Sequence, residues 1–145
     1  MTTRILFVCL GNICRSPAAE GAVRALLPGV QTDSAGTSDW HVGEPPYGPM
    51  QHAAQARGLD ISDLRARQFE AADFERFDLI VAMDDKNRRA IEAQRPACCA
   101  TPVTLLTDYA PEARADHVPD PYYTRDFDGV LDLIESCAQG LAAGL

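Results

Sequence analysis

The chain has 145 residues and a formal net charge of -8, with 13 lysines and arginines against 21 aspartates and glutamates. This length predicts a single domain over residues 1–145, and the charge argues against a nucleic-acid partner, whose phosphates would be repelled. No stretch approaches the roughly 18 apolar residues of a membrane span or looks like an export signal, so we expect no membrane association and a cytoplasmic location. Five cysteines without an export signal favour reduced thiols over a disulfide framework.

Strand and helix patterns alternate along the chain. Short runs rich in branched and aromatic side chains predict strands over residues 4–9, 30–34, 78–82 and 102–106. The intervening and following patterns predict helices over residues 17–27, 48–57, 85–94 and 127–142. This order implies an α/β fold with a doubly wound, four-stranded parallel sheet and helices on both faces.

The segment after the first strand carries the strongest chemical signal. Cys9 ends the strand, Arg15 follows after five residues, and Pro17 favours a first helical turn. The loop therefore lies between a strand end and a helix N-terminus, where free backbone N–H groups and the helix dipole favour a phosphate. Besides Cys9 and Arg15, this phosphate-binding loop contains Leu10, Gly11, Asn12, Ile13, Cys14 and Ser16.

Cys9 and Arg15 have the chemistry for phosphoryl transfer. A thiol beside a helix N-terminus and a guanidinium is expected to be a thiolate at rest, and therefore a nucleophile. Arg15 can hold two phosphate oxygens at once, and Ser16 can donate a hydrogen bond to the sulfur. A cysteine at a strand end is more often structural, but the coincidence of these residue types favours catalysis.

Asp120 is the candidate general acid. Pro119 and Pro121 flank it and predict a stiff segment outside any helix, which could hold a carboxyl group over the anion. Asp-Pro is also an ordinary turn dipeptide, so the residues alone leave the choice open. Three nearby acids are rivals for the role: Asp108, Asp116 and Asp126.

Some other polar and sulfur-containing residues have structural interpretations. Cys137 lies on the apolar face of the last predicted helix, and Asp126 can cap its N-terminus. Asp84 and Asn87 are expected to cap and position the helix that follows the third strand. Adjacent Cys98 and Cys99 have no histidine or further cysteine at metal-ligand spacing, so we expect no zinc site there.

The phosphate-binding loop resembles the signature of the low-molecular-weight protein tyrosine phosphatase family, down to the Leu-Gly-Asn-Ile-Cys-Arg-Ser-Pro order of residues 10–17. Further segments follow the family's order and approximate spacing: Asp33-Ser34-Ala35-Gly36-Thr37 with Trp40, Ala66-Arg67-Gln68, Ala82-Met83-Asp84 with Asn87, and Asp120-Pro121-Tyr122-Tyr123. The resemblance covers essentially the whole chain. It implies hydrolysis of phosphotyrosine and small aryl phosphates through a phosphocysteine intermediate, without a metal or other cofactor.

The resemblance also implies a role for each matching residue. Cys9 would be the nucleophile, Arg15 the phosphate clamp, and Asp120 the general acid and then base. The network that supports the loop would consist of Asn12, Ser16 and Ser34. The substrate cleft would be lined by Trp40, Tyr122 and Tyr123.

Two positions bear on the state of the loop. Cys14 would form a reversible disulfide with Cys9 and so protect it from irreversible oxidation, as the resemblance implies. Leu64 departs from the family, which commonly has a histidine there to brace the loop through Asn12 and the serines. This departure leaves the stiffness of the loop open.

Three alternative functions have to be weighed. An arsenate reductase has a similar fold and loop, but it uses two further redox cysteines, and adjacent Cys98 and Cys99 lack the spacing of such a relay. A protein-arginine phosphatase usually has a small polar residue in place of Ile13. A non-catalytic phosphate-binding module would not require Cys9, Arg15 and Asp120 together. We therefore expect a phosphotyrosine-containing protein as partner, with a tyrosine kinase as one candidate, and a monomer or weak homo-oligomer.

Overall fold

The computed structural model describes residues 3–145 and contains one parallel sheet. Its strands are β1 (Arg4–Cys9), β2 (Gln31–Gly36), β3 (Leu79–Ala82) and β4 (Val103–Leu105), in the spatial order β2-β1-β3-β4. All three strand pairs are parallel, and Val8 of β1 lies beside both Ala35 and Ala82. The predicted four-stranded parallel sheet is confirmed.

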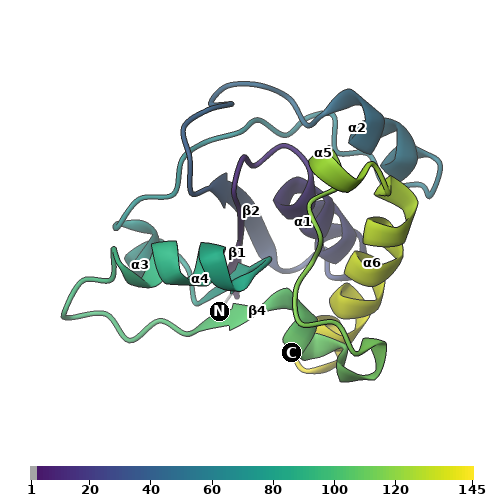
Figure 1. Ribbon diagram of the computed structural model, residues 1–145. Helices are drawn as coiled ribbons and strands as arrows, with labels where there is room; N and C mark the ends of the chain where they lie inside the picture. The colour runs from purple at the N-terminus through teal and green to yellow at the C-terminus, as the bar shows by residue number, and fades with distance from the viewer. Residues whose placement is uncertain (1–2) are drawn as a thin grey trace.

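Helices cover both faces of the sheet, as the sequence predicted. Figure 1 shows α1 (Arg15–Leu26), α2 (Gly48–Gln55) and α6 (Phe127–Ala143) on one side, and α3 (Asp73–Arg76) and α4 (Asp85–Glu92) on the other. The connection from β4 to α6 contains two 3-10 turns and a short helix: η1 (Leu106–Tyr109), η2 (Pro111–Ala113) and α5 (Pro121–Thr124).

The alternation of side chains along β1 divides the core into two layers. Ile5 and Phe7 are buried with residues of α1 and α6, whereas Leu6 and Val8 are buried with Phe74 of α3 and its neighbours. Both faces of β1 are therefore apolar, which explains its continuous hydrophobic run. Burial on both sides fixes the end of β1, and thus the position of Cys9.

The short elements differ from the sequence expectation. Residues 73–76 and the 3-10 turns were not predicted, because a single turn carries no periodic signal. Asp120 itself lies outside any helix, as expected, but the segment around it does not avoid helices, because Asp120 is the N-cap of α5 and Pro121 is the first residue of that helix. A proline at the first helical position lacks only an N–H that would have no intrahelical partner, so Asp-Pro here begins a helix. Helix α1 also begins two residues earlier than predicted, at Arg15.

The expectations for the longer helices are confirmed. Asp126 caps α6 by accepting a hydrogen bond from the Gly129 N–H at 3.0 Å, and Asp84 caps α4 by accepting one from the Asn87 N–H at 2.7 Å. Cys137 lies on the buried face of α6 and is fully buried. Within residues 3–145, no helix combines the length and apolar character that crossing a bilayer requires.

Candidate active site

The phosphate-binding loop wraps around the sulfur of Cys9 at the end of β1. The Asn12 N–H donates to the Cys9 Sγ at 3.2 Å, and the Ser16 Oγ lies 3.0 Å from the same sulfur. Asn12 adopts a left-handed backbone conformation with φ of 57°, which asparagine tolerates better than most residues. The turn at Asn12 therefore aims its N–H back at the sulfur.

Hydrogen bonds from outside the loop hold its carbonyl groups away from the centre. The N–H groups of Thr37, Ser38 and Tyr47 donate to the carbonyl oxygens of Cys9, Leu10 and Ile13 at 2.9, 3.0 and 2.8 Å, respectively. A side chain on Gly36 would meet the Leu10 carbonyl oxygen at 2.9 Å, so this close approach requires glycine. The centre of the loop is left to N–H groups, as anion binding demands.

Asn12 is braced at both ends of its side-chain amide. Its Nδ2 donates to the Ser16 Oγ at 2.8 Å, and its Oδ1 accepts from the backbone N–H of Arg67 at 3.0 Å. Leu64, where the resemblance led us to look for a histidine, is half-buried and packs against the main core. The backbone of Arg67 thus braces the loop at a point where no histidine is present.

The predicted role of Ser34 has to be corrected. Its hydroxyl group donates to the Glu20 carboxylate at 2.7 Å, and no hydrogen bond joins it to Asn12 or Ser16 within the described residues. Ser34 pairs with Phe7 in the sheet and so faces α1, which carries Glu20. Glu20 is only 4% exposed, and its burial raises the pKa of the carboxyl group from 4.5 to about 7, although the Ser34 hydrogen bond opposes this rise.

Arg15 is the buried cation of the site. Its Nη1 donates to the Asp84 Oδ2 at 2.7 Å and to the Val118 carbonyl oxygen at 3.0 Å. Burial alone would lower the pKa of Arg15, but the neighbouring Cys9, Asp84 and Asp120 raise it above its ordinary value. The guanidinium is therefore charged and fixed in direction before any ligand arrives.

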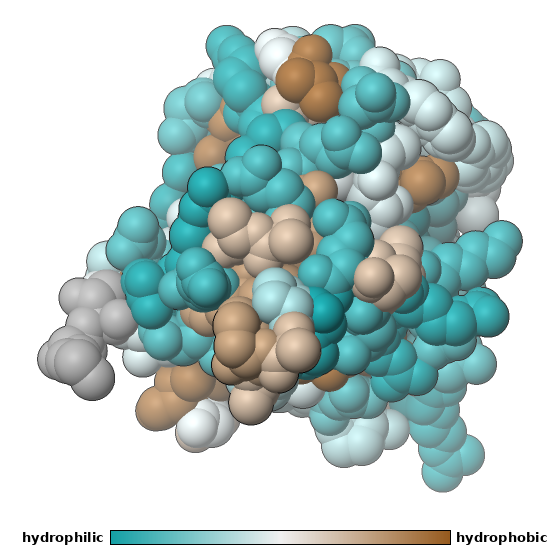
Figure 2. All heavy atoms as spheres, turned by 90° about the vertical axis from the view of Figure 1, so that its left-hand side faces the viewer, coloured by the Kyte–Doolittle hydropathy of each residue, from teal (hydrophilic) through white to brown (hydrophobic). Residues whose placement is uncertain are grey.

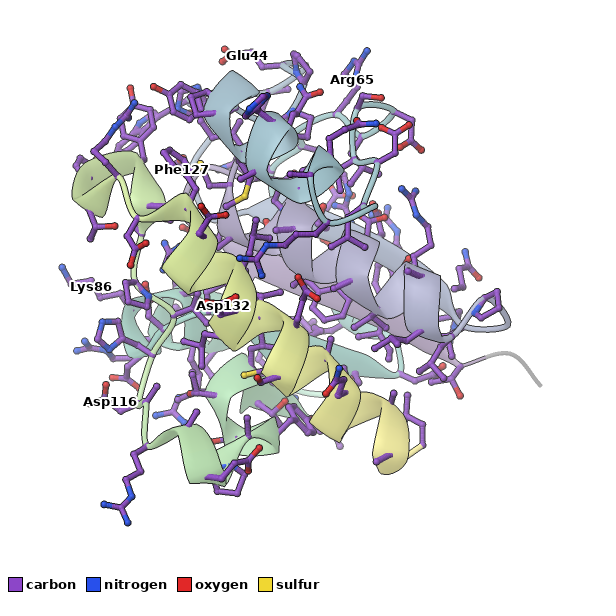
Figure 3. All side chains as sticks on the ribbon, turned by 90° about the vertical axis from the view of Figure 1, so that its right-hand side faces the viewer. Glu44, Arg65, Lys86, Asp116, Phe127 and Asp132 are labelled. Carbon is purple, nitrogen blue, oxygen red and sulfur yellow. The ribbon has the colours of Figure 1, made fainter. Side chains whose placement is uncertain are left out.

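Of the four candidates for the general acid, Asp120 is the one that lies next to Arg15. Its Oδ2 is 3.5 Å from the Arg15 Nη2, and its Oδ1 accepts from the Tyr122 N–H at 3.1 Å. Among the rivals, Asp108 bonds to the Leu105 N–H and Asp126 caps α6. The side chain of Asp116 is 96% exposed on the loop before α5 (Figure 3), where a hydrogen bond from His117 lowers its pKa.

A cleft of about 270 Å³ opens over the loop. Three exposed aromatic residues form part of its wall, with exposed fractions of 65% for Trp40, 40% for Tyr122 and 69% for Tyr123. Tyr122 and Tyr123 pack edge to face, with ring centroids 5.4 Å apart. The remaining residues that line the cleft are Cys9, Leu10, Gly11, Ile13, Cys14, Arg15, His41 and Asp120.

Cys14 lies in the loop beside Cys9, and its surroundings make it harder to ionise than a surface thiol. It is buried, and burial, together with the charges of Cys9 and Asp120, raises its pKa to about 12. Cys14 is therefore a neutral thiol at rest. The disulfide with Cys9 stays a prediction, because both cysteines are free in this structure.

Three contributors to the site were missed or assigned too small a role. From the sequence, Asp84 was expected only to cap a helix, although it follows β3, whose carboxyl end lies beside that of β1. That shared edge was a usable signal for a contact with Arg15. His41 lines the cleft and lies 2.8 Å from Glu44 through its Nδ1, and Arg67 acts through its backbone, so neither had a recognisable motif.

Comparisons with known proteins agree with this geometry. Residues 4–145 match the family model described as low molecular weight phosphotyrosine protein phosphatase. The chain is similar to the low molecular weight protein-tyrosine-phosphatase YfkJ of Bacillus subtilis, with 40% identity over 96% of this chain and 94% of the relative. It is also similar to a putative low molecular weight protein-tyrosine-phosphatase of Synechocystis, with 44% identity over 98% of this chain and 96% of the relative.

Solved structures extend the similarity to the fold. The crystal structure of YfkJ from Bacillus subtilis superposes with a TM-score of 0.94 at 36% identity, covering 99% of this chain and 94% of that one. A Drosophila arginine phosphatase superposes with a TM-score of 0.90 at 29% identity, covering 97% of this chain and 96% of that one.

Proposed function

Because the chain belongs to the low molecular weight phosphotyrosine protein phosphatase family, and is thus a phosphatase, we propose that it hydrolyses phosphotyrosine through a phosphocysteine intermediate on Cys9. One observation carries the proposal. A single cleft brings together a sulfur that accepts hydrogen bonds, a buried charged guanidinium and a carboxyl group, from Cys9, Arg15 and Asp120. These are the nucleophile, oxyanion clamp and proton donor that phosphoryl transfer from an aryl ester uses.

In the first step, the Cys9 thiolate attacks phosphorus as the bond to the phenolic oxygen breaks. The N–H groups of the loop and the guanidinium of Arg15 hold the phosphoryl oxygens, on which charge accumulates. Asp120, protonated in this step, gives its proton to the leaving phenolate oxygen. The products are a phosphocysteine and a free tyrosine hydroxyl group.

In the second step, water attacks the phosphocysteine. Asp120, now a carboxylate, accepts a proton from that water as the new phosphorus–oxygen bond forms. The phosphorus–sulfur bond breaks, and its electron pair returns to Cys9 as a thiolate. The Ser16 hydroxyl group, 3.0 Å from the sulfur, stabilises this leaving thiolate by a hydrogen bond.

The walls of the cleft favour an aromatic ester. Trp40 and Tyr122 offer flat apolar surfaces on which a phenyl ring can pack, and Ile13 adds an apolar side chain at the cleft. The second candidate, a phosphoarginine substrate, has the support of the structural similarity to the Drosophila arginine phosphatase. A charged guanidinium leaving group would gain less from packing against Ile13 than a phenyl ring would, so we favour phosphotyrosine.

The test compares Asp120→Asn with Asp116→Asn and Asp126→Asn on a series of aryl phosphates. Loss of the acid should lower kcat/KM much more for esters with a poor leaving group, such as the phenolate of tyrosine, than for esters of activated phenols. We therefore expect kcat/KM of Asp120→Asn alone to depend steeply on leaving-group pKa. An equal loss across the series, or the selective loss at position 116 or 126, would contradict the role given to Asp120. Parallel assays on phosphotyrosine and phosphoarginine peptides decide between the two substrates.

We further propose a phosphotyrosine-bearing protein, with a tyrosine kinase as one candidate, as the substrate in the cell. A cytoplasmic location would suit the five cysteines, all of which are free. Analytical ultracentrifugation would test the expected monomer or weak homo-oligomer, and cell fractionation would test the compartment.

A further inference from the structure

The loop between α4 and β4 carries two adjacent free thiols, Cys98 and Cys99. The side of the molecule that carries α3 and α4 is largely hydrophilic, with apolar groups near its centre and toward its edges (Figure 2). Cys98 is exposed and Cys99 half-buried. The loop leads into the amino end of β4, whereas Cys9 ends β1 at the carboxyl edge of the sheet, so about a strand length, on the order of 15 Å, separates the thiols from Cys9.

Specific contacts attach this loop to α3 and stabilise its conformation. The Thr101 Oγ1 donates to the Phe74 carbonyl oxygen at 2.5 Å, and the Arg95 Nη1 donates to the Cys99 carbonyl oxygen at 3.0 Å. The Arg95 guanidinium also lies 4.8 Å from the centre of the Phe74 ring. The loop is therefore held over α3 at both of its ends, which brings the thiols beside Glu75.

The spacing of the three side chains matches a metal site. The two Sγ atoms are 3.8 Å apart, and a carboxylate oxygen of Glu75 lies with them in a group whose members are all within 4.8 Å of one another. Two sulfurs bound to one tetrahedral zinc ion at about 2.3 Å are themselves about 3.8 Å apart. The thiols already have this separation, and rotation of the exposed Glu75 side chain can bring its oxygen closer.

We propose that Glu75, Cys98 and Cys99 form a binding site for a thiophilic divalent cation of the Zn²⁺ and Cd²⁺ class. Two thiolates select such ions over Mg²⁺ or Ca²⁺, which prefer oxygen ligands. Binding releases one proton from each thiol to solvent, and the two thiolates and one carboxylate complete three of four tetrahedral positions. Water takes the fourth position, because the site faces solvent.

This site was not visible in the sequence, where the adjacent cysteines have no third ligand at the usual spacing. The third ligand comes from α3, and only the fold brings it near. The site is also independent of the proposed phosphatase chemistry, because it uses none of the cleft residues and lies at the opposite end of the sheet.

The test is a titration of the reduced protein with Cd²⁺, followed through the ultraviolet charge-transfer band of the cadmium–thiolate bond, with Zn²⁺ competition to rank the two ions. The variants are Cys98→Ser, Cys99→Ser, the double serine variant and Glu75→Gln. Glu92→Gln is the matched control, because Glu92 bonds to Arg95 beside the same loop but stands outside the group of three. Hydrolysis of an aryl phosphate is measured for every variant.

We expect one equivalent of Cd²⁺ to bind with the signal of two thiolates, and at least about a tenfold loss of affinity in each serine variant. Glu75→Gln should weaken binding about tenfold with the thiolate signal retained, and Glu92→Gln should leave it unchanged. Phosphatase activity should stay at the wild-type level in all of these variants. Unchanged Cd²⁺ binding in the double serine variant would overturn the site, and equal affinities of Glu75→Gln and Glu92→Gln would remove Glu75 from it.

Discussion

Replacement of Glu20 by glutamine should stabilise the protein in a pH-dependent way. Glu20 is buried in α1 and accepts a hydrogen bond from Ser34, and its pKa is raised to about 7 by burial. A glutamine side chain keeps an oxygen for the Ser34 hydroxyl group but cannot lose a proton. The variant therefore removes the cost of a buried negative charge while it preserves the shape of the site.

The direction of this pH dependence follows from proton linkage. The folded protein holds the Glu20 proton more tightly than the unfolded chain does, so protonation of Glu20 stabilises the folded state. This stabilisation is complete below about pH 4.5. It declines as the pH rises and is lost above about pH 7. The difference between a pKa of 4.5 and one of about 7 corresponds to about 3 kcal/mol of unfolding free energy. Relative to the wild type, Glu20→Gln should gain this amount as the pH rises through that window.

Urea denaturation at about pH 5 and about pH 8 measures both proteins, and Glu112→Gln serves as the matched control because Glu112 is exposed. The stability difference between Glu20→Gln and the wild type should grow by about 2 to 3 kcal/mol between these pH values, whereas that of the control should stay constant. A constant difference for Glu20→Gln would refute the reasoning, because it would mean that Glu20 ionises alike in the folded and unfolded states.

Three further substitutions test the active site. Cys9→Ser should lower turnover by about a thousandfold or more while oxyanion binding persists, and intact-protein mass spectrometry after acid quench should find a phosphate adduct on wild-type Cys9 only. Arg15→Lys should lose about a hundredfold or more in kcat/KM, nearly as much as Arg15→Ala, because an ammonium group cannot hold two oxygens in parallel. Leu64→His should leave turnover within about twofold of the wild type, because Asn12 is already bonded at both ends. It should cost about 1 to 2 kcal/mol of stability by urea denaturation, because Leu64 packs on the core. A large gain in activity would show instead that the loop lacks a brace.

The strands and long helices could be predicted because burial imposes a repeating pattern on them. Strand β1 is apolar on both faces, and α6 alternates buried and exposed residues at helical spacing. The short helix α5 has no room for such a pattern. Its start could still have been recognised from the Asp120-Pro121 pair, which is a capping signal as well as a turn signal.

The candidate site could be predicted where the chemistry lies within one segment. Residues 9–16 predict an anion-binding site, because a strand end, a loop and a helix start follow one another in this segment. Ser34 shows the limit of this reasoning, since its partner depends on the face of β2 that it occupies. Asp33 on the opposite face bonds to Arg67, whereas Ser34 faces α1 and bonds to Glu20. A resemblance to a family suggests a role for Ser34, but it does not show which face of β2 the side chain occupies.

The two carboxylates beside Arg15 differ in how firmly their oxygens are held, and this difference separates their roles. Both oxygens of Asp84 are occupied, one by the Asn87 N–H and one by the Arg15 guanidinium, each at 2.7 Å. Asp84 is thus a positioning residue that holds Arg15 in direction. Asp120 has one oxygen bonded to the Tyr122 N–H, and its Oδ2 lies 3.5 Å from the Arg15 Nη2, beyond a strong hydrogen bond. When a phosphoryl group engages Arg15, the Asp120 Oδ2 can give up this weak contact and carry a proton, whereas Asp84 would have to break a short ion pair. Of the two acids, we therefore expect Asp120, and not Asp84, to exchange a proton with the leaving group.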